Sequence, residues 1–69
     1  MSMNAIRGAR MGVGLTQECA AEKLRVSQSA VSMWETGESL PRAELLPKIA
    51  ALYNCTVDDL LREPAQDSA

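Results

Sequence analysis

Residues 15–37, LTQECAAEKLRVSQSAVSMWETG, decide the fold, because they contain the start and stop signals of two short helices separated by a very short turn. Thr16 is a good N-cap for a helix over residues 17–24. Ser27 is a good N-cap for a helix that runs to about residue 36. The stretch ends in a glycine, which can adopt the left-handed backbone that commonly ends a helix.

The helix over residues 27–36 has two different sides. At about 100° per residue, Val31 and Trp34 lie together on one side, and Glu35 lies next to them. The opposite side and its margins carry Gln28, Ser29, Ser32, Met33 and Thr36. One side is therefore expected to be buried, whereas the other offers hydroxyls, an amide and a thioether but no positive charge.

Small and apolar residues recur through both helices at spacings that pack one helix against the other. Ala21 allows close approach of the helix axes, Val26 fills the corner, and Val31 packs across the pair. The expected core of the pair is Ala21, Leu24, Val26, Val31 and Trp34. This pattern is typical of a helix-turn-helix, in which the first helix holds the second so that its outer face can enter the DNA major groove.

The rest of the chain predicts three further helices. A helical spacing near residues 6–13 indicates one before the pair. Apolar repeats over residues 45–53 predict a fourth, with an irregular first turn because Pro47 removes a backbone donor. A polar capping pair then starts a short fifth helix over residues 57–62. The expected fold class is a compact, all-α, five-helix domain.

Length and composition agree with one small helical domain. The chain has 69 residues and 46% hydrophobic content, with one Trp, one Tyr and no Phe. Residues 1–62 are expected to form the domain, and residues 63–69 an acidic, disordered tail. The net charge of −2 comes from acidic residues near the C-terminal end, so the near-neutral body neither requires nor excludes DNA.

Several classes of function are disfavoured. Cys19 and Cys55 are far apart and no histidine is present, so we expect free thiols, no metal site and no cofactor. No motif for catalysis or for a small-molecule ligand is visible, and the protein is not expected to be an enzyme. No signal peptide or apolar run of about 18 residues occurs, which predicts a cytoplasmic protein without a membrane span.

The chain resembles the phage repressor and Cro-like helix-turn-helix domains, also called XRE-type. The resemblance runs from about Ile6 to Leu61 through GLTQECAAEKLRVSQSAVSMWETG, LP and KIAALYNCTVDDLL. It implies a lambda-repressor-like domain with the helix-turn-helix formed by helices 2 and 3. It also implies a small stand-alone transcriptional regulator that binds a pseudo-palindromic double-stranded DNA operator as a homodimer. Two departures are Arg25, where relatives usually have Gly, and Ala20, where they usually have Leu.

The resemblance assigns base-reading roles to the helix over residues 27–36. Gln28 occupies the principal base-reading position and can grip the N6 and N7 edge of adenine. Ser29 and Ser32 can bond base edges or phosphates. Met33 can pack on a thymine methyl group, or it can be a half-buried packing or dimer residue.

The resemblance also assigns phosphate contacts, an ion pair and a dimer surface. Arg10 matches the position that pairs with Glu35. Arg25 either contacts phosphate or is solvated. The expected phosphate contacts are Thr16, Gln17, Arg7, Arg25, Gly37 and Arg42. Core or dimer-interface roles are expected for Tyr53, Leu60 and Leu61.

A second function stays open from sequence. The outer helix face has no basic residue and the C-terminal end is acidic, which also suits use of the fold as a protein-binding module or an antitoxin-type partner. Base reading by Gln and Ser needs no charge, however, so DNA binding is the favoured interpretation. The missing charge predicts modest affinity for DNA.

Overall fold

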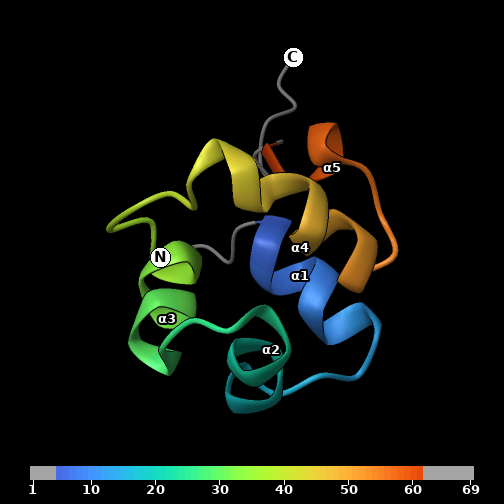
Figure 1. The fold of residues 1–69 in the computed structure, drawn as a ribbon. Coiled ribbons are helices and arrows are strands. Elements are labelled where there is room, and N and C mark those ends of the chain that lie inside the picture. Colours follow the sequence, from blue (N-terminus) through green and yellow to red (C-terminus); the bar gives the residue numbers. More distant parts are fainter. Residues whose placement is uncertain (1–4, 62–69) are drawn as a thin grey trace.

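The computed structural model describes residues 5–61, which form five α-helices and one 3-10 turn, with no strand among them (Figure 1). The elements are α1 (Ala5–Gly12), α2 (Gln17–Leu24), α3 (Gln28–Thr36), η1 (Ala43–Leu45), α4 (Leu46–Leu52) and α5 (Val57–Leu61). The expected all-α, five-helix class is confirmed. The tail expected over residues 63–69 lies outside the described residues, as does the expected last residue of the fifth helix.

Side-chain caps start the two helices of the helix-turn-helix where the sequence predicts. The Thr16 hydroxyl accepts a hydrogen bond from the Cys19 amide at 3.0 Å. The Ser27 hydroxyl accepts one from the Ala30 amide at 3.1 Å. Each cap satisfies a backbone donor that has no partner within its helix. The boundaries of α2 and α3 therefore follow from local chemistry.

The fourth helix begins irregularly, as expected. The 3-10 turn η1 leads directly into α4, and Pro47 lies in the first turn of α4, where a missing backbone donor costs little.

The short α5 begins with a reciprocal capping pair. Thr56 Oγ1 accepts from the Asp59 amide at 3.0 Å, and the Asp59 carboxylate accepts from the Thr56 amide at 3.2 Å.

The turn between α2 and α3 places a non-glycine residue in the left-handed conformation. Arg25 has φ 61° and ψ 44°. The Arg25 amide donates to the Glu22 carbonyl at 3.3 Å, and the Val26 amide donates to the Ala21 carbonyl at 3.0 Å. These two bonds form a Schellman motif, which satisfies carbonyls at the end of α2 but favours glycine. The turn therefore holds a non-glycine residue in a conformation that glycine adopts more readily.

Replacing Arg25 with glycine is expected to raise the free energy of unfolding by up to about 1 kcal/mol, because glycine has no Cβ to resist a positive φ. Part of the gain is offset by the greater backbone freedom of glycine in the unfolded chain. Urea titrations followed by circular dichroism measure the change. Asn54→Gly is the matched control, since Asn54 has φ 60° and asparagine tolerates this conformation better. A loss of stability in Arg25→Gly would show that the Arg25 side chain contributes more than the strain costs.

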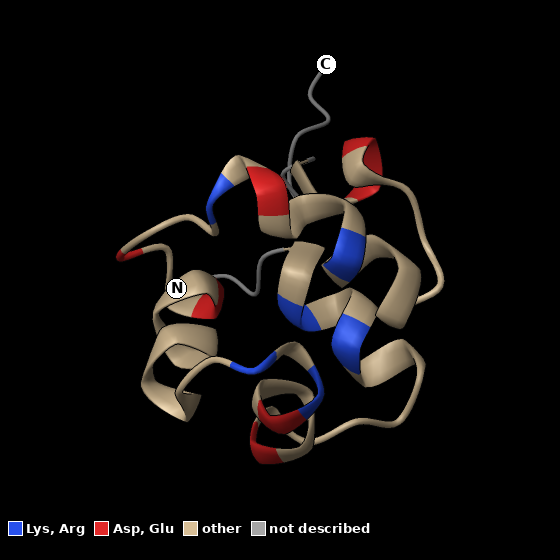
Figure 2. Ribbon diagram, viewed as in Figure 1, with Lys and Arg blue, Asp and Glu red and all other residues tan. Residues whose placement is uncertain are grey.

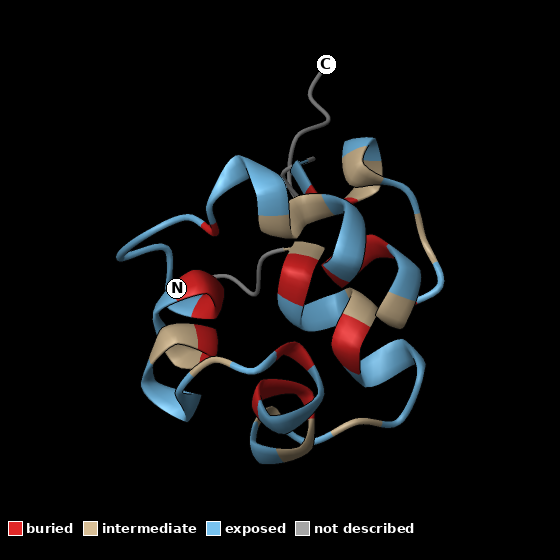
Figure 3. Ribbon diagram, viewed as in Figure 1, coloured by how far each residue is buried: buried red, intermediate tan, exposed pale blue. Residues whose placement is uncertain are grey.

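The core lies between all five helices, with α1 packed on α3 and α5, and α2 packed on α3 (Figure 3). Of the predicted helix-turn-helix core, Val26 is half-buried and the other four residues are buried. The buried apolar residues are Ile6, Ala20, Ala21, Leu24, Val31, Trp34, Ile49, Ala50, Tyr53 and Leu60. Ala20, where relatives usually have Leu, is fully buried and therefore still belongs to the core. Cys19 and Cys55 are free and half-buried.

The Tyr53 side chain is an unusual member of this core. It is 2% exposed, and its buried hydroxyl makes no hydrogen bond within the described part of the chain. Burial raises the pKa of Tyr53 to about 12, and the negative charge of Glu35 acts in the same direction. The neutral phenol is thus favoured in the folded protein.

Tyr53→Phe is expected to leave the free energy of unfolding unchanged at pH 7 or raise it by about 1 kcal/mol, because no internal hydrogen bond is lost and a buried polar atom is removed. Above pH 10 the difference should grow. The unfolded phenol ionises near its ordinary value of 10.0, whereas the folded one holds its proton to about 12. Wild-type stability therefore falls as pH rises through this window. Urea unfolding at pH 7, 9 and 11 tests this, and parallel pH profiles for the two proteins would contradict it.

Candidate nucleic-acid interface

The outer side of α3 is open to solvent. Gln28, Ser29 and Met33 are exposed, and Ser32 is half-buried. The opposite side of the same helix buries Val31, Trp34 and Glu35 (Figure 3). Met33 is 38% exposed, which leaves its thioether accessible to a bound molecule. The division of α3 into a buried side and an accessible polar side is therefore the one expected from sequence.

A shallow hollow joins the start of α2 to the start of α3. It is lined by Thr16, Gln17 and Gln28, together with Gly14, Leu15 and neighbouring residues of α1 and α2. The fold thus brings the predicted base-reading glutamine together with two predicted phosphate contacts. Glu18 also lines this hollow, and its negative charge opposes a phosphate there.

A buried ion pair lies behind the hollow. Arg10 Nε donates to Glu35 Oε2 at 2.6 Å, and Arg10 Nη2 donates to Glu35 Oε1 at 3.1 Å. Arg10 is 9% exposed and Glu35 is 6% exposed. The hydrogen bond to Glu35 raises the pKa of Arg10, although desolvation opposes the rise. The structure therefore contains the pair expected from sequence, in a bidentate arrangement.

Two further bonds extend this pair to the rest of the helix-turn-helix. Arg10 Nη1 donates to the Leu15 carbonyl at 2.6 Å. Gln17 Nε2 donates to Glu35 Oε1 at 3.1 Å. These contacts join α1, the connection to α2, the first turn of α2 and the last turn of α3. They fix how α3 is held relative to the helices behind it.

The predicted basic phosphate contacts are distributed unevenly (Figure 2). Arg7 is exposed on α1. Arg25 and Arg42 line a groove with Ala30 and Trp34, on the side of α3 away from Gln28. Arg42 forms an exposed ion pair with Glu44 at 3.6 Å. The structure does not bring Arg25 and Arg42 together with Thr16 and Gln17.

The predicted phosphate contact at Gly37 conflicts with the hydrogen bonding at the end of α3. Gly37 has φ 87°, and its amide donates to the Met33 carbonyl at 3.0 Å. The amides of Glu38 and Ser39 donate to the same carbonyl at 3.0 and 3.3 Å. These donors are used inside the protein, because the left-handed residue turns the chain back over the helix end. The Gly37 amide is therefore not available to phosphate in this conformation.

The three residues predicted as core or dimer interface separate clearly. Tyr53 is 2% exposed and Leu60 is 3% exposed, which places both in the core and away from a dimer partner. Leu61 is 53% exposed. Of these three residues, Leu61 alone can contact a second copy.

Neither a metal-binding cluster nor a membrane-spanning helix occurs among residues 5–61. No group of three or more His, Cys, Asp or Glu side chains in this range is arranged to hold a metal ion. Within the same range, no helix has the length and apolar character needed to cross a membrane.

The fold, the short turn and the accessible outer side of α3 together define a helix-turn-helix domain. Comparison with known families gives the same result, since the family described as Helix-turn-helix matches residues 6–60. The chain belongs to this family.

Three curated relatives share the domain. The HTH-type transcriptional activator BcrR of Enterococcus faecalis is 46% identical over 52 residues, which are 75% of this chain and 26% of BcrR. The HTH-type transcriptional regulator ImmR of Bacillus subtilis (strain 168) is 38% identical over 56 residues, 81% of this chain and 44% of ImmR. An uncharacterized HTH-type transcriptional regulator of Archaeoglobus fulgidus is 36% identical over 55 residues, 80% of this chain and 79% of that protein.

The chain thus spans about a quarter of BcrR and less than half of ImmR. No solved structure matches the sequence significantly.

Proposed function

We propose that this domain binds double-stranded DNA sequence-specifically as a transcriptional regulator, with α3 in the major groove. The observation that carries the proposal is the arrangement of α3. Its outer side presents Gln28, Ser29 and Met33, while a buried Arg10–Glu35 pair anchors its inner side. A helix held in this way can enter the groove without losing its own packing. The names of the three relatives, all transcriptional regulators or activators, support the same role.

The chemistry of this surface suits base edges. The Gln28 amide can donate to adenine N7 and accept from adenine N6, a bidentate contact that discriminates adenine from other bases. Ser29 and Ser32 can donate to or accept from several base edges and so add little selectivity. Met33 supplies an apolar, polarizable contact for a thymine methyl group.

Phosphate contacts must come from outside the reading surface, because Lys and Arg are absent from α3. The start of α2, with Thr16 and Gln17 beside Gln28, and the exposed Arg7 on α1 are the proposed contacts. Few positive charges would be placed against the duplex, and Glu18 opposes phosphate. Binding should therefore depend weakly on salt compared with a strongly basic domain.

A homodimer on a pseudo-palindromic operator is part of the proposal. Two copies would read half-sites about 34 Å apart, one helical turn of DNA. The exposed Leu61 at the end of α5 is the proposed dimer contact, since Tyr53 and Leu60 are buried.

Selection from a pool of random duplexes tests the proposal and requires no known operator sequence. The expected result is enrichment of one motif with two related halves, bound in a gel shift more tightly than unselected DNA. DNA upstream of the protein's own gene is a second probe. No enrichment at any salt concentration would reject DNA reading and favour the protein-binding use of the same fold.

A further inference from the structure

The positive side chains of this acidic protein gather around one groove. Two adjoining hollows, which share Leu24, Arg25 and Lys48, run between the α2–α3 turn and the α4 region. Of the six Lys and Arg residues among residues 5–61, the four that line these hollows are Lys23, Arg25, Arg42 and Lys48. Among the residues that line the two hollows, Glu44 is the single acidic one, and Arg42 forms an ion pair with it at 3.6 Å.

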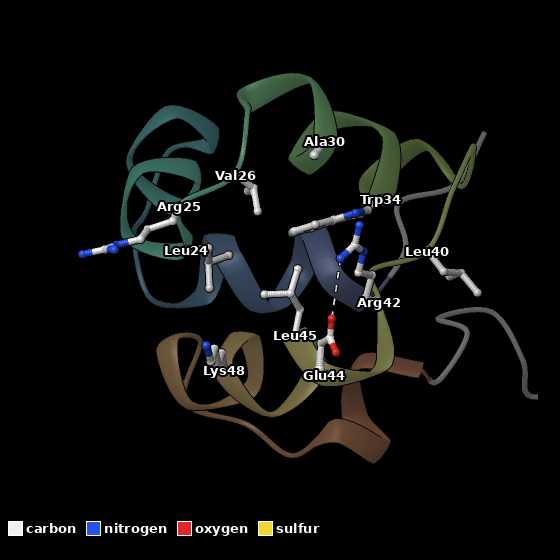
Figure 4. A pocket seen from close by; sticks show the side chains of 10 residues that line it. All are labelled: Leu24, Arg25, Val26, Ala30, Trp34, Leu40, Arg42, Glu44, Leu45 and Lys48. Carbon is white, nitrogen blue, oxygen red and sulfur yellow. Dashed lines mark ion pairs between the residues drawn. The ribbon is translucent and has the colours of Figure 1, made fainter.

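The floor of the groove is apolar. The apolar side chains are Leu24 at the end of α2, Val26 in the turn that follows, Trp34 of α3 and Leu45 of η1. They point toward one another (Figure 4). At one end lies Leu40, which is 73% exposed, the highest exposure among the large exposed hydrophobic residues of the described chain. An accessible leucine beside an apolar floor leaves hydrophobic surface in contact with water, which is typical of an interaction site.

The groove lies apart from the surface proposed to read DNA. At about 100° per residue, the α3 residues in the groove, Ala30 and Trp34, are centred roughly 150° around the helix from the reading side. A ligand in the groove would therefore leave Gln28 accessible. Arg25, Arg42 and Lys48 line the hollow that contains Ala30 and Trp34, and none of them lines the hollow that contains Gln28.

We propose that this groove binds a protein segment in which apolar side chains are flanked by carboxylates. The apolar floor would bury the leucine-like side chains, and Lys23, Arg25, Lys48 and Arg42 would pair with the carboxylates at the rim. Charge complementarity selects this partner, because four cations and one carboxylate line the groove of a chain whose net charge is −2. The site would let a partner protein dock on the domain while α3 occupies DNA.

Fluorescence titration with designed peptides tests the proposal. The probe is a fluorescein-labelled peptide of glutamate and leucine arranged with helical spacing. Two matched peptides carry lysine in place of glutamate or serine in place of leucine. Trp34 is the single tryptophan of the chain and lines the groove, so its emission reports occupancy independently of the label.

The expected result is saturable binding of the glutamate–leucine peptide alone, with a shift in Trp34 emission. Lys48→Glu should weaken this binding at least about tenfold, and Leu40→Ser should also weaken it. Arg7→Glu makes the same charge change outside the groove and should retain binding. Lys48→Glu should keep the circular dichroism spectrum and the melting temperature of the wild type, which shows that the variant is folded.

Four results would overturn the proposal. They are the absence of binding, equal binding of the serine peptide, equal losses in Lys48→Glu and Arg7→Glu, and displacement of the peptide by duplex DNA. The last result would assign the groove to phosphate. The direct peptide titrations contain no DNA, so their failure leaves the proposed DNA-reading function intact, and the displacement by duplex DNA is a separate measurement.

Discussion

Arg10→Ala is expected to lower the free energy of unfolding by about 3–5 kcal/mol, because it leaves a buried carboxylate without its counter-charge. Glu35 is 6% exposed, and its carboxylate accepts hydrogen bonds from Arg10 and Gln17. In the variant, the Arg10 bonds are lost and the bond from the Gln17 amide remains. A domain of this size has a total stability on the order of 3–9 kcal/mol. The variant should therefore be partly or largely unfolded at 25 °C, as measured by circular dichroism and thermal melting.

Arg7→Ala is the matched control, since Arg7 lies on the same helix and is exposed. Its effect should stay within about 0.5 kcal/mol. The double variant Arg10→Met with Glu35→Leu should recover much of the lost stability, because no charge remains buried. Equal melting temperatures for Arg10→Ala and Arg7→Ala would show that the pair does not hold α1 against α3.

The parts of this fold that depend on local chemistry could be predicted from sequence. Thr16 and Ser27 satisfy amides three residues ahead, so the starts of α2 and α3 needed no tertiary information. The inward position of Glu35 follows from helix periodicity, and a buried carboxylate requires a partner. The family resemblance then pointed to Arg10, which the structure places in that role.

Features that depend on how the helices pack were not predictable in the same way. Gln17 stays a predicted phosphate contact, but its amide also donates to Glu35, 18 positions along the chain, and this bond was not expected. The Gly37 amide was expected to face phosphate, but the turn after α3 directs it to the Met33 carbonyl. Folding brings Glu35 near Gln17, so residue type alone does not reveal that bond. The Gly37 bond is local, four residues back along the chain, and follows from the glycine that ends α3.

The distribution of charge shows the same limit. Arg25 and Arg42 are 17 positions apart in sequence, so only packing could place them on one groove with Lys48. Helix periodicity correctly separates the two sides of α3, but it does not show which cations surround each side. The sequence did indicate that the positive charges lie outside α3, because α3 contains no Lys or Arg.

Gln28→Ala is expected to reduce the preference for the selected operator over unselected DNA roughly tenfold to hundredfold per half-site, because one bidentate base contact accounts for about 1–3 kcal/mol of discrimination. Binding to unselected DNA should hardly change. The dependence of affinity on salt should also be retained, since the substitution removes no charge. Gln28 is exposed and is not among the hydrogen-bond partners that the described structure gives for the buried ion pair, so the melting temperature should be close to that of the wild type.

Gln17→Ala is the matched comparison, because it removes the same side chain from the other edge of the same hollow. It should weaken binding to all duplexes alike, as expected for a phosphate contact, and lower the melting temperature by removing a hydrogen bond to Glu35. Gel shifts with selected and unselected duplexes, at two or more salt concentrations, separate the two patterns. If Gln28→Ala weakens both duplexes equally, or leaves the preference unchanged, then Gln28 does not read a base and the specificity must come from another part of the surface.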